Sequence, residues 1–203
     1  LPDGEGELEL AFRQLKEKLE NEGLFDIAAK KEIPNLPKKI ALVTSATSAA
    51  LQDMLKVVTS RWKLSEIYIF DALTQGENAP SSLIKALKRA DRYGVDVIVL
   101  ARGGGSKEDL WCFNDEGLAR EIYATKTPVI SAIGHEIDYV ISDFVADRRS
   151  LTPSAAMLDL LPDEEAFSQY LDRLSDDLDS ALNLKITKKQ NLLNLLLSKF
   201  SSN

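Results

Sequence analysis

The stretch that decides the fold is "DVIVLARGGGS", Asp96–Ser106, in which Ile, Val and Leu lead into an arginine, three glycines and a serine. A short run with such continuous apolar character is typical of a strand buried on both faces of a parallel sheet. Similar runs and helical patterns alternate along the chain: runs at 39–45, 66–72 and 127–134, helical patterns near 47–61, 80–93 and 115–125. The alternation predicts an α/β fold, an open and mostly parallel sheet of about four strands flanked by helices.

Helical patterns also flank this core. Leu8 and Phe12 begin a helical spacing over roughly residues 6–22, and the two prolines of "KKEIPNLPKK" predict a linker after it. Thr152 before Pro153 predicts a helix start. A second apolar stripe runs from Glu164 to Phe200, which predicts a long C-terminal helix. One stripe of that length needs a partner helix, with docking on its own domain as the alternative.

The composition says more about the cellular compartment of the protein than about its function. The formal net charge of −7 argues at first against nucleic acid, but the 17 residues 163–179 hold seven acids and one base and so supply most of that charge. The single cysteine, Cys112, rules out an internal disulfide and fits a reducing compartment. With no run of ~18 apolar residues and no signal peptide, we expect a cytoplasmic protein that does not enter a membrane.

The glycines follow a predicted strand, at the edge of the sheet where α/β proteins bind ligands. Without Cβ atoms, Gly103, Gly104 and Gly105 allow successive backbone N–H groups to converge on an anion. Ser106 opens a capping-box pattern that would start a helix directly behind them, and Arg102 offers a bidentate, permanently charged fork. We therefore expect a phosphate site, with a tight turn whose glycines adopt positive φ as the alternative.

His135 is the only histidine, so paired-histidine metal motifs and, with one cysteine, thiolate zinc sites are excluded. Its position at a predicted strand end, with Asp138 close by, favours a general acid or base over a core histidine. Asp138 would orient the imidazole or cap the next helix. We expect Asp143 and Asp147 to form structural salt bridges or caps instead.

Four stretches together resemble the catalytic domain of the large subunit of bacterial exodeoxyribonuclease VII. They are "RGGGSKEDLWCFNDEGLAREI", "TPVISAIGHEID", "ISDFVADRRSLTPSAA" and, more loosely, "VTSATSAALQDML". The resemblance runs from about Lys38 to Pro162. It divides the chain into a connecting helix and linker (1–37), an α/β catalytic domain (38–162) and the truncated start of a coiled-coil region (163–203). Since the chain begins without Met and ends inside a helical pattern, we expect a piece of a longer protein that also carries an OB-fold.

The resemblance implies an exodeoxyribonuclease that hydrolyses single-stranded DNA from both the 5′ and 3′ ends and releases 5′-phosphorylated products. Catalytic and DNA-binding positions would be Asp53, Arg102, His135 and Asp138, with Gly103, Gly104, Gly105 and Ser106 on the phosphate. No metal would be required, or Mg²⁺ would assist at Asp53 or Asp138. The region 163–203 would begin the coiled coil that binds several copies of a small helical subunit.

Two other functions fit the same residues. One is an α/β enzyme acting on a small phosphorylated metabolite, which would need a closed pocket. The other is a non-catalytic module that binds single strands or phosphate, which would bind equally well after His135→Ala and cleave nothing.

Overall fold

The computed structural model describes residues 3–105, 107–133 and 139–201. The chain divides into two compact units, residues 1–162 and residues 163–203. The first unit contains the sheet, and the second is a single helix.

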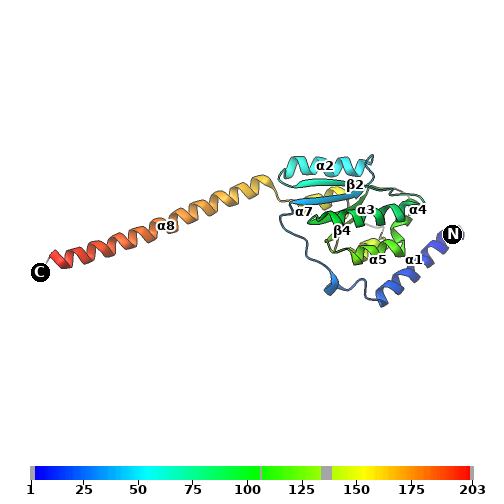
Figure 1. Ribbon diagram of the computed structural model, residues 1–203, viewed down its shortest axis with the longest axis horizontal. Coiled ribbons are helices and arrows are strands. Elements are labelled where there is room, and N and C mark those ends of the chain that lie inside the picture. The colour runs from blue at the N-terminus through cyan, green and yellow to red at the C-terminus, as the bar shows by residue number, and fades with distance from the viewer. Residues whose placement is uncertain (1–2, 106, 134–138, 202–203) are drawn as a thin grey trace. The chain divides into compact units, whose positions relative to one another are not determined.

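The first unit is built on an all-parallel sheet in the order β2-β1-β3-β4-β5 (Figure 1). The strands are β1 Lys39–Thr44, β2 Glu66–Asp71, β3 Val97–Arg102, β4 Val129–Ile133 and β5 Arg148–Arg149. The central β3 and β4 are buried along their whole length, as their continuous apolar sequences predicted. The predicted fold class is confirmed. The sheet has five strands where about four were expected, because β5 is two arginines long and lacks any apolar pattern.

Helices cover both faces of this sheet, as right-handed crossovers require. On one face, α2 (Ala49–Arg61) packs beside α7 (Pro153–Leu160). The other face carries α3 (Ala79–Tyr93), α5 (Glu116–Ala124) and α6 (Ile141–Val145), which contact one another in turn. The chain enters through α1 (Asp3–Asn21) and a short 3₁₀ helix, η1 (Ile27–Ala29).

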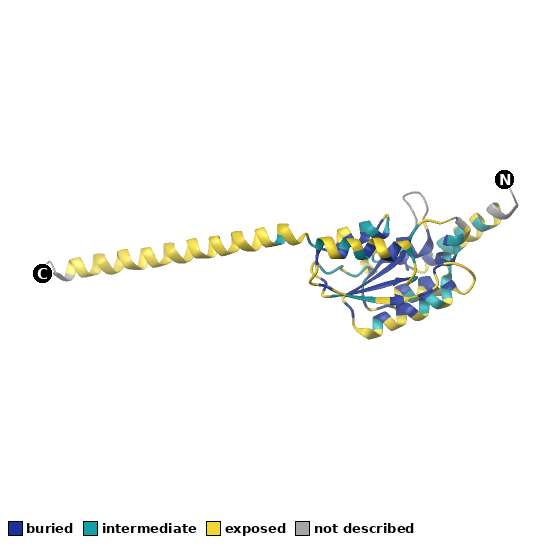
Figure 2. Cartoon of the chain, turned by 90° about the horizontal axis from the view of Figure 1, so that it is seen from above, coloured by how far each residue is buried: buried dark blue, intermediate teal, exposed yellow. Residues whose placement is uncertain are grey.

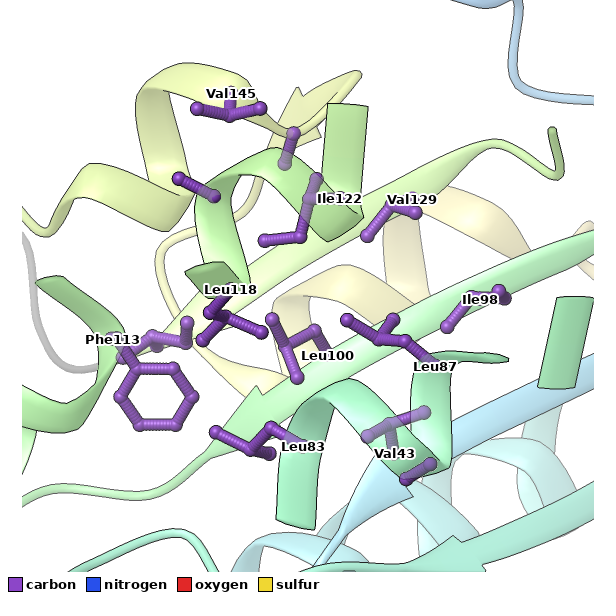
Figure 3. Close-up of a cluster of buried hydrophobic side chains, with 14 of the residues drawn as sticks. Val43, Leu83, Leu87, Ile98, Leu100, Phe113, Leu118, Ile122, Val129 and Val145 are labelled. Atoms are coloured by element: carbon purple, nitrogen blue, oxygen red, sulfur yellow. The ribbon is translucent and has the colours of Figure 1, made fainter. Parts of the chain in front are cut away.

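Apolar side chains between the sheet and the layer of α3, α5 and α6 form a core cluster (Figure 3). Leu87 of α3 and Leu118 of α5 are fully buried there against Leu100 of β3. Leu19 of α1 belongs to the same cluster, and Phe12 packs on its margin. The amphipathic N-terminal helix is thus an integral part of the first unit, since its apolar stripe completes this core.

Side-chain caps fix where the helices start. Ser48 accepts a hydrogen bond from the Leu51 amide (3.1 Å) at the start of α2. Thr152 does the same for the Ala155 amide (3.1 Å) with Pro153 in the first turn of α7, which confirms the start predicted there.

Two aspartates whose side chains are almost fully buried hold the β4–β5 side of the sheet. Asp143 accepts from Ser131 Oγ (2.6 Å) and the Val140 amide (3.2 Å) and pairs with Arg149 (3.3 Å). Burial raises the pKa of Asp143, against the lowering effect of these donors. Asp147 accepts from the amides of Lys31 and Val129 (both 2.7 Å). The capping and bridging roles predicted for both aspartates are confirmed.

The second unit is α8, Glu164–Ser201, a helix of 38 residues. Its start is capped by Asp163, which accepts from the Ala166 amide (3.0 Å). The leucines of its predicted stripe are exposed (Figure 2), among them Leu171, Leu174, Leu178, Leu182 and Leu193. The long predicted helix is confirmed. Among the described residues, no helix combines the length and the apolar character needed to cross a membrane.

The core makes a first prediction. Leu100→Ala removes a fully buried side chain and should lower the free energy of unfolding by about 2–5 kcal/mol. Both tryptophans, Trp62 and Trp111, lie in the first unit, so urea denaturation followed by their fluorescence reports its stability. Leu64→Ala is the matched control, because Leu64 is 73% exposed, and should change stability by less than about 0.5 kcal/mol. Equal losses in the two variants would contradict this assignment of the core.

Candidate functional site

The strand order predicts a ligand site between β1 and β3. In a sheet ordered 2-1-3-4-5, the connections leaving these two neighbouring strands turn to opposite faces, and ligands bind beyond their carboxyl ends. Here β1 ends at Thr44 and β3 ends at Arg102. The hydroxyl-rich turn after β1 therefore lies at the same edge of the sheet as the glycine loop after β3, which the sequence singled out.

The turn after β1 is organised by side-chain oxygens. Thr44 Oγ1 and Ser48 Oγ are 3.3 Å apart, and the Ala46 amide donates to Asp71 Oδ1 (2.8 Å). Asp71 is the last residue of the neighbouring β2, paired in register with Thr44. The carboxyl end of β2 thus fixes the turn from which α2 begins.

Arg102 is buried at the centre of this predicted site. Only 6% of the residue is exposed, and its guanidinium donates to the carbonyl oxygens of Thr74 and Asp109 (3.1 Å for the latter) and to Gln75 Oε1 (3.2 Å). Its Nη2 also lies 3.4 Å from Asp109 Oδ2. The arginine therefore ties the loop after β2 to the segment behind the glycines, and direct contact between Arg102 and a phosphate stays a prediction.

The glycine loop passes close to the guanidinium of Arg102. A Cβ on Gly105 would lie 2.5 Å from Arg102 Nη2 and 3.3 Å from Asp109 Oδ2, whereas among the described residues a Cβ on Gly103 would meet only Ala50 Cβ, at 3.7 Å. Neither Gly103 nor Gly105 has a positive φ. For these two, the alternative of a turn that requires positive φ is therefore wrong, and Gly105 is needed because a side chain would displace the buried guanidinium.

A helix starts directly behind the glycines, as predicted, but it is short. It is α4, Lys107–Leu110, and the 3₁₀ helix η2, Trp111–Asn114, replaces it after one turn. One turn aligns few peptide dipoles, so the favourable potential expected there for an anion is small. Ser106, the predicted cap, lies outside the described residues.

Cys112 packs beneath the same loop. Its Sγ lies 3.4 Å from the Thr74 carbonyl oxygen and 3.6 Å from that of Asp109, the two carbonyls that also bind Arg102. Burial raises the pKa of Cys112 to about 11, although the charge of Arg102 acts in the opposite direction. The thiol is therefore protonated at neutral pH and is no nucleophile there.

The predicted catalytic residues are placed only in part. Asp53 is exposed on α2, where it pairs with Lys56 (2.9 Å), one helical turn after the Ala50 that faces Gly103. His135 and Asp138 lie outside the described residues. The last residue of β4 before them, Ile133, is in register with Arg102.

The described chain that follows this segment is held against η2. Asn114 Oδ1 accepts from the Ile141 amide (2.8 Å), and Ser142 Oγ donates to the Phe113 carbonyl oxygen (2.9 Å). Within residues 3–105, 107–133 and 139–201, no three His, Cys, Asp or Glu side chains are grouped closely enough to hold a metal ion.

Sequence reasoning missed the partners of Arg102. Thr74 binds it through a backbone carbonyl, which has no side-chain signature. Gln75, however, follows the second strand, and Asp71, which binds the Ala46 amide, ends it. The rule that ligands bind beyond strand ends applies to both residues. Applied to the second strand, that rule would have found both residues.

Comparison with known proteins identifies the family of this chain. A family model described as exonuclease VII, large subunit, matches residues 24–203. The chain belongs to the exonuclease VII large-subunit family. It is 63% identical over 196 residues to the exodeoxyribonuclease 7 large subunit of Campylobacter fetus (97% of this chain, 51% of that protein). It is 60% identical over 198 residues to that of Campylobacter jejuni strain RM1221 (97% and 51%) and 57% over 192 residues to that of Campylobacter hominis (95% and 50%).

The predicted resemblance to this family is confirmed. The chain spans about half the length of these curated large subunits. Both the glycine loop and the predicted His135 segment fall inside the matched range.

For this member of the exonuclease VII family, the glycine loop makes a second prediction. Gly105→Ala should lower the free energy of unfolding by roughly 1–3 kcal/mol, because the new methyl group overlaps the buried guanidinium. Gly103→Ala is the matched control two residues away, with room for the methyl group, and should change stability by less than about 0.5 kcal/mol. Urea titration measures both, and a Gly105→Ala chain as stable as wild type would refute the proposed close approach.

Cys112 makes a third prediction. Iodoacetamide reacts with the thiolate, so at pH 8 the raised pKa alone should make alkylation on the order of 100-fold slower than in the urea-unfolded chain. Because no other cysteine is present, mass spectrometry of the intact chain reads this site alone. Gly105→Ala should accelerate labelling by loosening the loop over Cys112. Rapid alkylation of the native wild-type chain would contradict the buried, protonated thiol.

Proposed function

We propose that this chain is the catalytic region of an exodeoxyribonuclease that hydrolyses phosphodiester bonds of single-stranded DNA from both the 5′ and 3′ ends. The observation that carries the proposal is family membership over nearly the whole chain, at about 60% identity to named exodeoxyribonuclease large subunits. The position of the glycine loop and Arg102 at the predicted site between β1 and β3 supports it. In the proposed division, residues 1–37 connect, 38–162 catalyse and 163–203 begin a coiled coil.

The glycine loop would hold the scissile phosphate. Backbone N–H groups of Gly103, Gly104 and Gly105, with Ser106, would donate to its non-bridging oxygens. Arg102 lies at the base of this loop and adds a fixed positive charge. Charge developing on those oxygens is stabilised by donors already in place, which is the largest catalytic contribution available to such a site.

Proton transfer would fall to His135, with Asp138 fixing its tautomer. Water attacks phosphorus, the bond from phosphorus to the 3′ oxygen breaks, and the phosphate stays on the 5′ side of the released product. One proton leaves the attacking water and one reaches the departing 3′ oxygen. His135 would serve one of these two transfers, and Asp53 would orient the water.

The reaction would need no metal. If Mg²⁺ assists, oxygen ligands suit it, and Asp53 or Asp138 would hold it, where its charge would stabilise the phosphate. Asp53 is exposed on α2, with Lys56 as its ion-pair partner, so its carboxylate is accessible to an ion or a water.

The partner would be a small helical subunit, several copies of which bind through the region that starts at residue 163. The relatives are named large subunits, which implies a smaller one. The apolar stripe of α8 offers the surface: Leu178 and Leu182, one turn apart, are 69% and 54% exposed. Burying such a stripe against another helix is the usual driving force for helical association.

A cleavage assay tests the function, and it is our fourth prediction. End-labelled single-stranded and duplex DNA would be incubated with the full-length large subunit assembled with its small subunit, in Mg²⁺ or in EDTA. We expect cleavage of single strands only, in both buffers, with 5′-phosphorylated products. His135→Ala should slow cleavage by on the order of 10²–10⁴-fold, the usual contribution of general acid–base catalysis.

Arg13→Ala is the matched control, because Arg13 is exposed on α1 and pairs only locally with Glu9 in the described structure. It should cleave like the wild type. Equal cleavage by His135→Ala would overturn the catalytic assignment, and loss of all activity in EDTA would make the metal essential. Absence of cleavage in every condition would favour a binding module instead.

A further inference from the structure

A groove of about 480 Å³ lies at the edge of the sheet, between β2 and α3. It is lined by Tyr68, Ile69, Phe70, Arg89, Arg92 and Tyr93. β2 is the first strand of the sheet and pairs only with β1, so its other backbone edge has no neighbouring strand in the described structure. The glycine loop contributes nothing to the lining, and this groove is therefore a separate surface.

Aromatic rings form its floor and one wall. The rings of Tyr68 and Tyr93 have centroids 4.6 Å apart, and Phe70 meets Tyr93 edge-on at 6.1 Å. Tyr93 is 53% exposed, and neighbouring Ile69 is 46% exposed. Phe70 is buried and Tyr68 is partly buried, so Tyr93 is the ring that is most accessible to a ligand.

Basic side chains flank the rings. Lys85, Arg89 and Arg92 recur at i, i+4 and i+7 on α3, so they form one exposed stripe beside the groove. The Arg89 guanidinium lies 5.8 Å from the centre of the Phe70 ring. In the described parts of the chain these three cations form no ion pair, unlike their neighbour Lys88, which pairs with Glu121 (3.2 Å).

The nearby acids are engaged by local partners. Asp91 on the same helix accepts from the amide and hydroxyl of Thr127. Those bonds lower the pKa of Asp91 against the raising effect of its burial. Glu66 accepts from the Tyr68 hydroxyl, and Asp71 holds the Ala46 amide. These carboxylates keep their negative charges, but none of them lines the groove, whose charged lining residues are Arg89 and Arg92.

We propose that this groove binds single-stranded DNA outside the cleavage site, an inference that rests on the proposed function. Bases stack on Tyr93 and Tyr68, and phosphates pair with Arg89, Arg92 and Lys85. Exposed rings interleaved with unpaired cations match the two parts of an unpaired strand, whose bases have apolar faces and whose backbone is anionic. A duplex hides its base faces, so the groove selects single strands.

The groove also leads to the predicted site between β1 and β3. Past Phe70, β2 ends at Asp71, and the loop after it carries Thr74 and Gln75, which bind the Arg102 guanidinium. A strand lying along β2 in the direction of its carboxyl end therefore reaches the glycine loop. The surface would keep a strand aligned with the site between successive cleavages.

The salt dependence of binding tests the charges, in our fifth prediction. A fluorescein-labelled phosphorothioate oligodeoxythymidylate resists hydrolysis, so anisotropy measures binding to the full-length protein whether or not it cleaves DNA. Removing one phosphate-binding cation should reduce the slope of log K against log salt by about 0.7, so Arg89→Ala with Arg92→Ala should reduce it by roughly 1.4. Lys88→Ala with Lys126→Ala removes two exposed charges from the adjacent surface and should leave the slope unchanged.

Stacking is tested separately. Tyr93→Ala should weaken binding by about 5- to 100-fold, whereas Tyr93→Phe keeps the ring and should bind like the wild type. Photocrosslinking with a strand containing 5-iodouracil should label Tyr68 or Phe70 in the tryptic peptide 64–85 and Tyr93 in the peptide 93–102, with the labelled residue identified by fragmentation of each peptide. The crosslink does not depend on how much affinity any other part of the protein supplies.

Three outcomes would overturn the proposal: an unchanged salt slope in the double arginine variant, crosslinks on neither peptide, or equal binding by Tyr93→Ala and Tyr93→Phe. Altered sedimentation of DNA-free Tyr93→Ala with unchanged DNA binding would assign the groove to a second copy of the chain and overturn it too. Crosslinking at the groove without any cleavage would refute the proposed function alone. Cleavage with an unchanged slope would refute the groove alone.

Discussion

The buried guanidinium of Arg102 joins three segments of the chain. It is the last residue of β3, and its hydrogen bonds reach the loop after β2 at Thr74 and Gln75 and the segment behind the glycines at Asp109. A cation removed from water is tolerated only when its donors are satisfied and a counter-charge is near. Asp109 supplies both a carbonyl and a carboxylate, so the charge is stable where it lies.

Several other features follow from that placement. The loop must pass close to the guanidinium, so Gly105 cannot carry a side chain. Cys112 fills the space beneath and shares two carbonyls with the arginine. A positive charge fixed at the base of a bare backbone loop is a suitable environment for a phosphodiester, because the donors need no rearrangement when the anion arrives. The same interaction thus shapes the loop and supplies its electrostatic character.

Helix α3 contributes to both the core and the proposed DNA groove. Its inner face, with Leu83 and Leu87, packs on the sheet and belongs to the core. Its outer face presents Arg89 and Arg92 beside the aromatic rings of the sheet edge. Since β2 runs from this groove to the loop that binds Arg102, the proposed cleavage site and the proposed DNA groove are connected through one strand. A helix whose buried face is so well packed provides a fixed surface for a flexible ligand.

The sequence by itself determined the α/β sheet, the alternation of helices and strands, the helix start at Thr152, and the candidate loop. These depend on local patterns: apolar runs, helical spacing and turn residues that act within a few positions of one another. Only the tertiary structure decided what Arg102 binds, because a backbone carbonyl from a distant loop carries no mark in the sequence. The two-residue β5 was invisible for a related reason, since it is a strand only through its pairing with β4. The groove likewise exists only once α3 packs on β2 and brings Tyr93 and Arg89 beside Tyr68, about twenty residues away along the chain.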